Sequence, residues 1–410
     1  MPMVTPNVKQ SICPTSRWLS ATAALVVTVI VALAGGALGY FFSWLASIPV
    51  YAATYNLGYV IRIQTVGLVI GLCLGVAKSP MIKVQKRRRM DVVMGILGVV
   101  AVLGSEWYFF GLGVHRRAIA TIYRAGGHIE RDRHGRVTAV LLGGRPYRGF
   151  SGDDFALLGA FPHMTKLWVR WPKVGFEEAR QIGQFTQLES LSLYGPEADD
   201  DVIAELRPLV NLEELYLSYT GISDDGLQTV NTFVQLRTLD LQYTDITDAG
   251  VEALRLPNLR SLDLAATHVG DAGVAHLAAM AMYEDLQLAQ TEVTQAGIET
   301  LSDQSHLRVV GLAYTRVSGS GFQSIKHWTR LESLNLNETN VNDEDLRWIA
   351  EMTSLRDLQL TGAPITDAGI RHCHGLSNLT YLLLNGTKVS IEAVDCIRAR
   401  LPQCNVVKNH

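Results

Sequence analysis

A phrase of about 24 residues repeats ten times between residues 164 and 402, and it limits the folds that this 410-residue chain can adopt. One well-kept copy reads Leu-x-x-Leu-x-Leu-x-x-Thr-x-Ile-Thr-Asp-Ala-Gly from Leu236 to Gly250. A fixed period in this range predicts a stacked solenoid, in which each unit buries its apolar face against its neighbours. The steps are 24 residues long, with one of 23, and the ten units begin at Met164, Leu188, Leu212, Leu236, Leu259, Tyr283, Leu307, Leu331, Leu355 and Leu379.

The first half of each unit has the pattern of a short strand, because side chains along a strand point alternately to opposite faces. Leu239 and Leu241 are therefore expected to point into the core, while Asp240 and Gln242 are expected on the exposed face of the sheet. The second half has the pattern of a helix start, because a residue such as Thr247 can accept hydrogen bonds from free backbone N–H groups. The sequence thus predicts one strand and one short helix in each unit.

These motifs resemble the leucine-rich repeat family, and within it the cysteine-containing, F-box-associated type with 24-residue bacterial-type units. The resemblance covers about residues 137–410 and implies an α/β solenoid, a horseshoe with parallel strands on its concave face and short helices or 3-10 turns on its convex face. One position departs from the family pattern, since threonine stands where Asn or Cys is usual, and Ala363 stands there once. A threonine hydroxyl can still bond the backbone of the turn. The threonines are Thr220, Thr244, Thr267, Thr291, Thr315, Thr339 and Thr387.

Segments on both sides of the ten units (164–402) extend the solenoid. Residues 115–163 are expected to form a linker and N-terminal cap, with a short helix, a glycine turn and a partial repeat whose strand begins at Val137. Residues 403–410 are expected to add a closing strand.

The N-terminal region predicts three transmembrane helices before the solenoid, at about 19–42, 58–77 and 92–114, after a cytoplasmic segment 1–17. Residues 18–77 carry a single charge, Arg62, and are otherwise apolar or small. The first apolar segment can alternatively be interpreted as a cleaved signal peptide. Arg62 and Glu106 would lie within spans, where either an ion pair between them or contact with the polar membrane surface would satisfy them.

The segment 78–89 carries six positive charges and no acid, and such clusters stay cytoplasmic. The sequence therefore predicts a multi-pass protein of the cell membrane, in contact with the lipid bilayer, whose repeats lie outside the cytoplasm. Residues 1–117 hold 11 Lys and Arg against 2 Asp and Glu, whereas residues 118–410 hold 25 against 37. An acidic repeat region argues against nucleic acid as a partner, because it would repel phosphate.

No catalytic, metal or cofactor motif stands out, and we expect no enzyme activity. The zinc-protease, phosphate-loop and nucleophile-elbow patterns are all absent from the sequence. His372, Cys373 and His374 could be metal ligands, but Cys373 occupies a core position of its unit, where a free cysteine acts as a small hydrophobe. A disulfide between Cys373 and Cys396 remains an alternative outside the cytoplasm.

The expected ligand-binding surface is the aromatic end of the concave face, since exposed Trp and Tyr residues are typical of binding hot spots. An acidic stripe follows the aromatic cluster. The alternative is that Tyr merely suits a pleated surface. The candidate residues are Trp168, Trp171, Tyr194, Tyr216, Tyr219 and Tyr243 in the cluster, and Asp240, Asp263 and Asp285 in the stripe.

The sequence as a whole indicates a membrane-tethered, non-catalytic scaffold that recognises a protein, a peptide or a glycan outside the cytoplasm. The resemblance to F-box substrate receptors implies an alternative role as an adaptor in ubiquitin-type protein turnover. A third interpretation makes the repeats the input domain of a sensor in the membrane segment.

Overall fold

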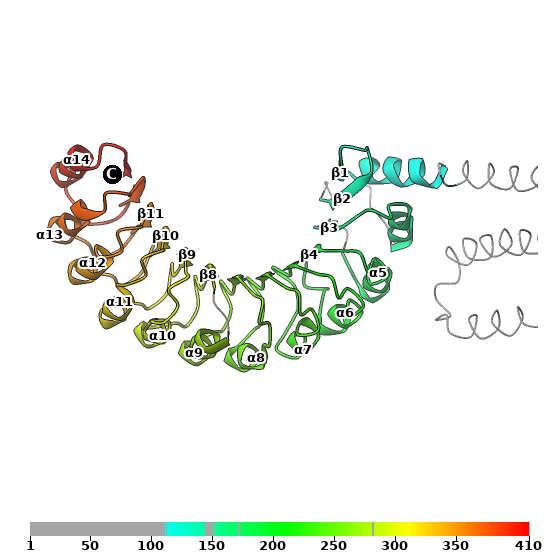
Figure 1. Cartoon of the computed structure of the whole chain (residues 1–410), viewed down its shortest axis with the longest axis horizontal. Coiled ribbons are helices and arrows are strands. Elements are labelled where there is room, and N and C mark those ends of the chain that lie inside the picture. The colour runs from blue at the N-terminus through cyan, green and yellow to red at the C-terminus, as the bar shows by residue number, and fades with distance from the viewer. Residues whose placement is uncertain are drawn as a thin grey trace, which may run out of the picture. The chain divides into compact units, whose positions relative to one another are not determined.

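The fold is known here from a computed structural model that describes residues 111, 113–143, 150, 152–170, 173–280 and 283–409. These residues belong to one compact unit, Tyr108–His410. Its described part contains a single sheet of thirteen strands arranged in sequence order (Figure 1). The strands are β1 (His128–Arg131), β2 (Val137–Leu142), β3 (Lys166–Val169), β4 (Ser190–Leu193), β5 (Glu214–Tyr216), β6 (Thr238–Asp240), β7 (Ser261–Asp263), β8 (Asp285–Gln287), β9 (Val309–Gly311), β10 (Ser333–Asn335), β11 (Asp357–Gln359), β12 (Tyr381–Leu383) and β13 (Asn405–Val407).

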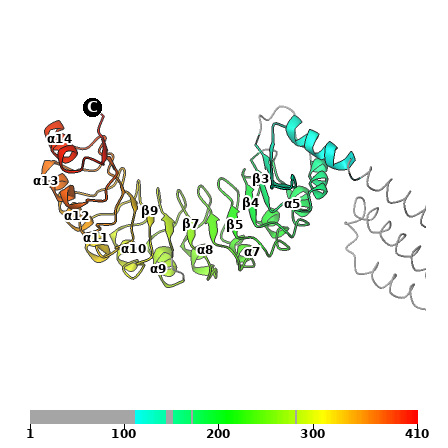
Figure 2. The same cartoon turned by 45° about the horizontal axis from the view of Figure 1, so that its top comes forward.

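Short helices alternate with the strands and cover the convex side of the arc, while the strands line its concave side (Figures 1 and 2). The expected solenoid of alternating strands and helices is therefore confirmed. The helices are η2 (Gly152–Ala160), α5 (Phe176–Ile182), α6 (Asp200–Ala204), α7 (Leu227–Val230), α8 (Asp248–Ala253), α9 (Asp271–Met280), α10 (Gln295–Thr300), α11 (Ser320–Ile325), α12 (Asp343–Ile349), α13 (Asp367–Ile370), η3 (Arg371–Gly375) and α14 (Ile391–Arg400).

The strands follow the repeat register. β1 and β2 are antiparallel, and every later pair is parallel, with equivalent positions of successive units opposite each other. Leu215, Leu239 and Leu262 are aligned in this way, and all three are fully buried. Each unit therefore adds one layer to a continuous apolar core, as the repeat period predicts.

In seven of the ten units, the turn that follows the strand is closed by a threonine at the ninth position of the unit. Each threonine hydroxyl donates to the backbone carbonyl three residues earlier, at 2.5–2.7 Å, in all seven units that carry one. The expected bond between this hydroxyl and the turn is thus confirmed. Since the threonines are buried, the bond satisfies a polar group that water does not reach.

The eighth position, just before this threonine, has a left-handed backbone in nine units. Three of the nine residues are glycine, but six carry side chains, with φ between 55° and 60°. A left-handed backbone is costly for residues with a Cβ atom. The nine are Gly195, Tyr219, Tyr243, Ala266, Gln290, Tyr314, Glu338, Gly362 and Gly386.

Aspartates at the thirteenth position of the units tie neighbouring units together. Each accepts hydrogen bonds from the residue at the twelfth position of the next unit, as Asp271 accepts from the N–H of Thr294 at 2.8 Å and from its hydroxyl at 2.6 Å. Five such pairs recur, which are Asp200 with Ser223, Asp224 with Thr247, Asp271 with Thr294, Asp343 with Thr366, and Asp367 with Ser390.

Both ends of the described solenoid are covered. A helical stretch that ends at residue 124 precedes β1, and it buries Ala118 and Ile122 against the first apolar layer. At the other end, the Arg398 guanidinium donates to the carbonyl of Val406 at 2.9 Å, which satisfies an acceptor of the last strand. Such covers protect the ends of a solenoid from solvent and from pairing with other chains.

The predicted fold class needs one correction, because it placed three transmembrane helices before the solenoid. Nowhere in the described ranges is there a helix with the length and apolarity needed to cross a bilayer. The spans at 19–42 and 58–77 lie outside those ranges, as does nearly all of 92–114. The helical stretch that ends at residue 124 buries Ala118 and Ile122 in the protein, and His115 lies edge-on to Phe161 at 5.1 Å. The fold class that is established is the solenoid alone.

Candidate ligand-binding face

Trp168 and Tyr216 lie on strands of the concave sheet. The register aligns Trp168 with Ser192, Tyr216 and Asp240 across strands β3 to β6. The Trp168 side chain is 38% exposed, and its indole N–H donates to the Ser190 hydroxyl at 3.2 Å. An exposed indole held by a hydrogen bond offers a contact surface that is already ordered before a ligand arrives.

Three other tyrosines form a row on the loops that follow β4, β5 and β6. The rings of Tyr219 and Tyr243 are stacked, with centroids 4.2 Å apart and planes 11° from parallel. Tyr194 packs against Tyr219 at 5.2 Å, and the Arg170 guanidinium lies 5.6 Å from the centre of the Tyr194 ring. At the other end, the Tyr243 hydroxyl donates to the Gln290 side chain at 3.3 Å. We call Tyr194, Tyr219 and Tyr243 the tyrosine row.

Backbone strain accompanies the tyrosine row. Tyr219 and Tyr243 hold left-handed conformations, with φ of 58° and 56°, and both side chains remain more than 40% exposed. Strained backbone persists only where the surrounding structure determines it, and it is frequent at ligand-binding sites. Here the strand pairing and the threonine turn impose the conformation, and the consequence is that large rings stand side by side in solvent.

Three carboxylates share the concave sheet next to the row. Asp240 and Asp263 are opposite each other on β6 and β7, whereas Asp285 on β8 pairs with Ser261 and is therefore displaced along its strand. Burial raises the pKa of Asp263 to about 6, and the charges of Asp240 and Asp285 add to the effect, although the Ala265 N–H opposes it. Burial also raises the pKa of Asp240 and of Asp285.

A family model described as "Leucine Rich repeat" matches residues 209–230, 236–254, 255–278 and 351–371. These segments are leucine-rich repeats. The matched model describes a repeat and not a family of enzymes. A comparison with curated proteins finds no significant match.

Solved structures with leucine-rich repeats resemble this chain at low sequence identity. An internalin from Listeria monocytogenes is 16% identical, with a TM-score of 0.49, over 70% of this chain and 86% of its own. A second Listeria monocytogenes internalin is 23% identical, with a TM-score of 0.40, over 49% and 83%. The Arabidopsis receptor kinase HAESA, solved with a peptide hormone and a co-receptor, is 15% identical, with a TM-score of 0.40, over 64% and 40%.

The nine candidate site residues fall into separate groups on the leucine-rich repeats. The tyrosine row contains Tyr194, Tyr219 and Tyr243, while Trp168 and Tyr216 lie on the sheet beside the carboxylates. Trp171 lies outside the described residues. The sequence interpretation did not single out Gln290, which bonds the end of the row, although its place two units beyond Tyr243 in the same repeat position was a usable signal.

The cysteines of the leucine-rich repeats are unpaired. Cys373 and Cys404 are buried, and Cys396 is exposed, so the alternative of a Cys373–Cys396 disulfide is not what the structure contains. Burial raises the pKa of the Cys373 thiol to about 12, which keeps it protonated. Within the described ranges, no group of three or more His, Cys, Asp or Glu side chains is placed to hold a metal ion.

Proposed function

We propose that this leucine-rich repeat chain is a non-catalytic scaffold that binds an extended segment of a protein or peptide at the aromatic end of its concave face. The single observation that carries the proposal is the tyrosine row, in which exposed rings stack across consecutive repeats. Exposed, ordered aromatic rings give contact area at little entropic cost, which is why Tyr and Trp dominate binding hot spots.

The spacing of the row supports a peptide ligand. Its rings come from successive repeats, and adjacent parallel strands lie about 4.8 Å apart. The row spans about 10 Å and an extended peptide advances roughly 3.3 Å per residue, so a chain of about three residues would cross the whole row. Trp168 and Tyr216 on the adjoining sheet would widen the contact. The polar carboxylates beside them would then select the ligand by its hydrogen bonds and charge.

The test is a selection of displayed peptides against the full-length protein, followed by affinity measurements on variants. Tyr219→Ala and Tyr243→Ala are expected to weaken selected peptides at least tenfold, as hot-spot truncations do. Tyr314→Ala is the matched control, because Tyr314 has the same repeat position, a φ of 60° and an exposed side chain but is not part of the row. Equal losses for all three variants would exclude the row, and a failure to select any peptide would exclude the ligand class.

We also propose that the repeats act outside the cytoplasm. The support lies in the sequence before the described residues, where six Lys and Arg and no acid occupy 78–89 beside long apolar stretches. Basic clusters of this kind stay on the cytoplasmic side of a membrane. Protease added to intact cells is expected to degrade the repeats, whereas complete protection would favour the intracellular adaptor role.

A further inference from the structure

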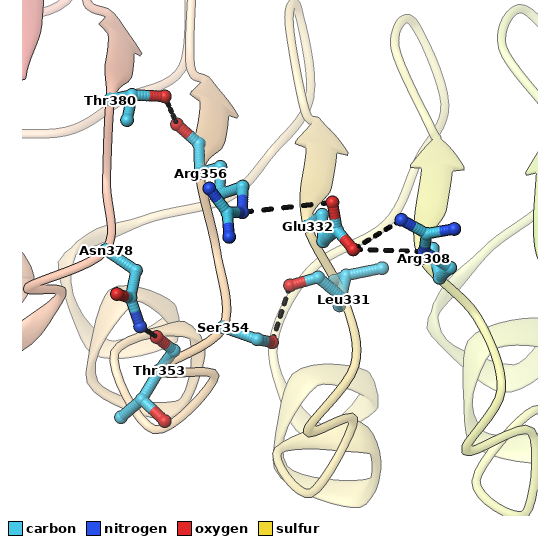
Figure 3. Close-up of polar contacts among 8 residues, drawn as sticks. All are labelled: Arg308, Leu331, Glu332, Thr353, Ser354, Arg356, Asn378 and Thr380. Atoms are coloured by element: carbon cyan, nitrogen blue, oxygen red, sulfur yellow. Dashed lines mark hydrogen bonds and ion pairs between the residues drawn. The ribbon is translucent and has the colours of Figure 1, made fainter.

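A second polar feature lies at the other edge of the sheet, where the strands begin. Arg308, Glu332 and Arg356 each hold the second position of a unit, directly before β9, β10 and β11. Figure 3 shows Glu332 between the two arginines, with its carboxylate turned toward both. They line a hollow of about 430 Å³, together with Thr329, Arg330, Ser354 and Asn378. This volume falls within the ~300–1,000 Å³ range of small-ligand sites.

The charges in the hollow are unequal. Three arginines face one carboxylate, which leaves two positive charges uncompensated among the lining residues. The surrounding region 118–410 is acidic, with 25 Lys and Arg against 37 Asp and Glu. A local excess of guanidinium groups in an acidic domain is therefore not explained by general basic character.

The three arginines differ in how far they are already paired. Arg308 donates to one Glu332 oxygen through Nε at 3.0 Å and Nη2 at 2.7 Å. Arg356 lies 3.9 Å from the other oxygen, which is a weak contact, and it is 62% exposed. Arg330 has no hydrogen bond or ion pair among the residues that the structure describes, and it is exposed. Two guanidinium groups thus keep donors for a ligand.

Two further lining groups fix the shape of the hollow, and one of them adds a donor. The Asn378 amide donates one N–H to the Thr353 carbonyl at 2.9 Å, which leaves its second N–H for a ligand. Ser354 donates its hydroxyl to the Leu331 carbonyl at 2.6 Å and so can only accept from a ligand (Figure 3). These bonds hold the floor of the hollow in place, and they anchor it to the neighbouring units.

We propose that this hollow binds a doubly charged tetrahedral oxyanion, a phosphate either free or carried as a monoester, between Arg330 and Arg356. Guanidinium groups present forked N–H donors that match phosphate oxygens, and two uncompensated charges match a dianion. Glu332 pairs with Arg308 and so occupies that guanidinium group, and its negative charge lowers the electrostatic potential of the hollow. It therefore limits the affinity of the site for phosphate. This site is separate from the tyrosine row and does not depend on the proposed function.

The test is a calorimetric titration of the full-length protein with inorganic phosphate, O-phosphoserine and acetate at constant ionic strength. Arg330→Gln and Arg356→Gln are each expected to weaken phosphate binding roughly tenfold, as the loss of a charge-assisted contact does. Arg237→Gln is the matched control, because Arg237 also holds the second position of its unit and lies 3.4 Å from Glu213. Arg237→Gln removes the same charge at a position outside the hollow, so it is expected to leave the affinity for phosphate unchanged.

A second pair of variants tests the role of Glu332. Glu332→Gln is expected to tighten phosphate binding several-fold because it removes the competing carboxylate, whereas the control Glu213→Gln is expected to have no effect. Binding of O-phosphoserine as tight as that of phosphate would identify a monoester site, and exclusion of it would identify a site for the free anion. Acetate binding as tight as phosphate binding, or equal losses in Arg356→Gln and Arg237→Gln, would overturn the proposal.

Discussion

Thr247 donates both its backbone N–H and its hydroxyl to the carboxylate of Asp224, at 2.9 and 2.6 Å, across the boundary between two repeats. The same hydroxyl accepts the N–H of Ala249 at 3.2 Å and so caps its own helix. One threonine therefore starts a helix and fastens it to the preceding unit. This explains why Thr and Asp are adjacent in the repeated phrase.

Replacing Asp224 by alanine is expected to lower the free energy of unfolding by about 1–3 kcal/mol, because two donors of Thr247 lose their acceptor. Gln295 provides a control, since it occupies the aspartate position of a unit in which no such pair to the next repeat is described. Gln295→Ala should change stability by less than about 0.5 kcal/mol. Denaturant titration of both variants measures the difference, and equal losses would contradict the role of the carboxylate.

Gly250 is required by the same contact. A Cβ atom at this helical position would lie 2.1 Å from Oδ1 of Asp224, so Gly250→Ala is expected to destabilise the protein by about 1–3 kcal/mol. In an Asp224→Ala background the two nearest atoms are removed and only the Cβ atom of residue 224 remains close, at 3.1 Å, so the same change should cost much less, under about 1 kcal/mol. A double-mutant cycle measures this coupling, and additive effects would show that the close approach is not the cause.

The period and the apolar spacing were enough to predict the strands, the helices and the buried leucines, because they repeat in every unit. The left-handed eighth position was harder to predict. Tyr, Ala, Gln and Glu occupy it in six units, and only Gly195, Gly362 and Gly386 hint at it. Strand pairing and the threonine turn impose this conformation, and both are tertiary effects that override local preference.

The sequence was enough to name the tyrosines as candidates, but it did not predict how they are arranged. Tyr194 lies at the seventh position of its unit, whereas Tyr219 and Tyr243 lie at the eighth, so a simple repeat register does not make them a row. Their stacking depends on the left-handed loops. The arginine hollow was not predicted, because Arg308 and Arg356 look like ordinary exposed charges until Glu332 and Arg330 are seen beside them.

Tyr314→Gly is expected to raise the free energy of unfolding by about 0.5–1 kcal/mol. The residue has a φ of 60° and a 58% exposed side chain, so glycine relieves backbone strain and little packing is lost. Tyr243→Gly should gain nothing, because the same relief is offset by the loss of a ring stack worth about 0.5–1.5 kcal/mol. Parallel thermal and denaturant unfolding compares the two, and an equal gain in both would mean that the stack contributes no stability.

Asp263→Asn is expected to change the pH dependence of stability. The folded-state pKa of about 6 lies above the ordinary aspartate pKa of 3.8, so the carboxyl group favours the folded state when protonated and loses that contribution as pH rises from about 4 through 6. The variant should match the parent protein near pH 4 and be more stable than it near pH 8. Asparagine is accommodated at this position, since Oδ1 of Asn335 accepts the N–H of Asn337 at 3.1 Å in another unit. A stability difference that stays constant over this pH range would contradict the prediction.

Native thiol labelling is expected to separate the three cysteines of the repeats. Cys373 is fully buried, and its pKa near 12 leaves almost no thiolate at pH 8, so neither access nor ionisation favours reaction. Burial likewise raises the pKa of Cys404 to about 11, whereas Cys396 is exposed. Alkylation at pH 8 followed by peptide mass spectrometry should therefore modify Cys396 quickly, and Cys373 and Cys404 only after denaturation. If Cys396 were labelled only after a reductant is added, it would be part of a disulfide. The C-terminal repeat would then have to rearrange to bring a buried thiol to the surface.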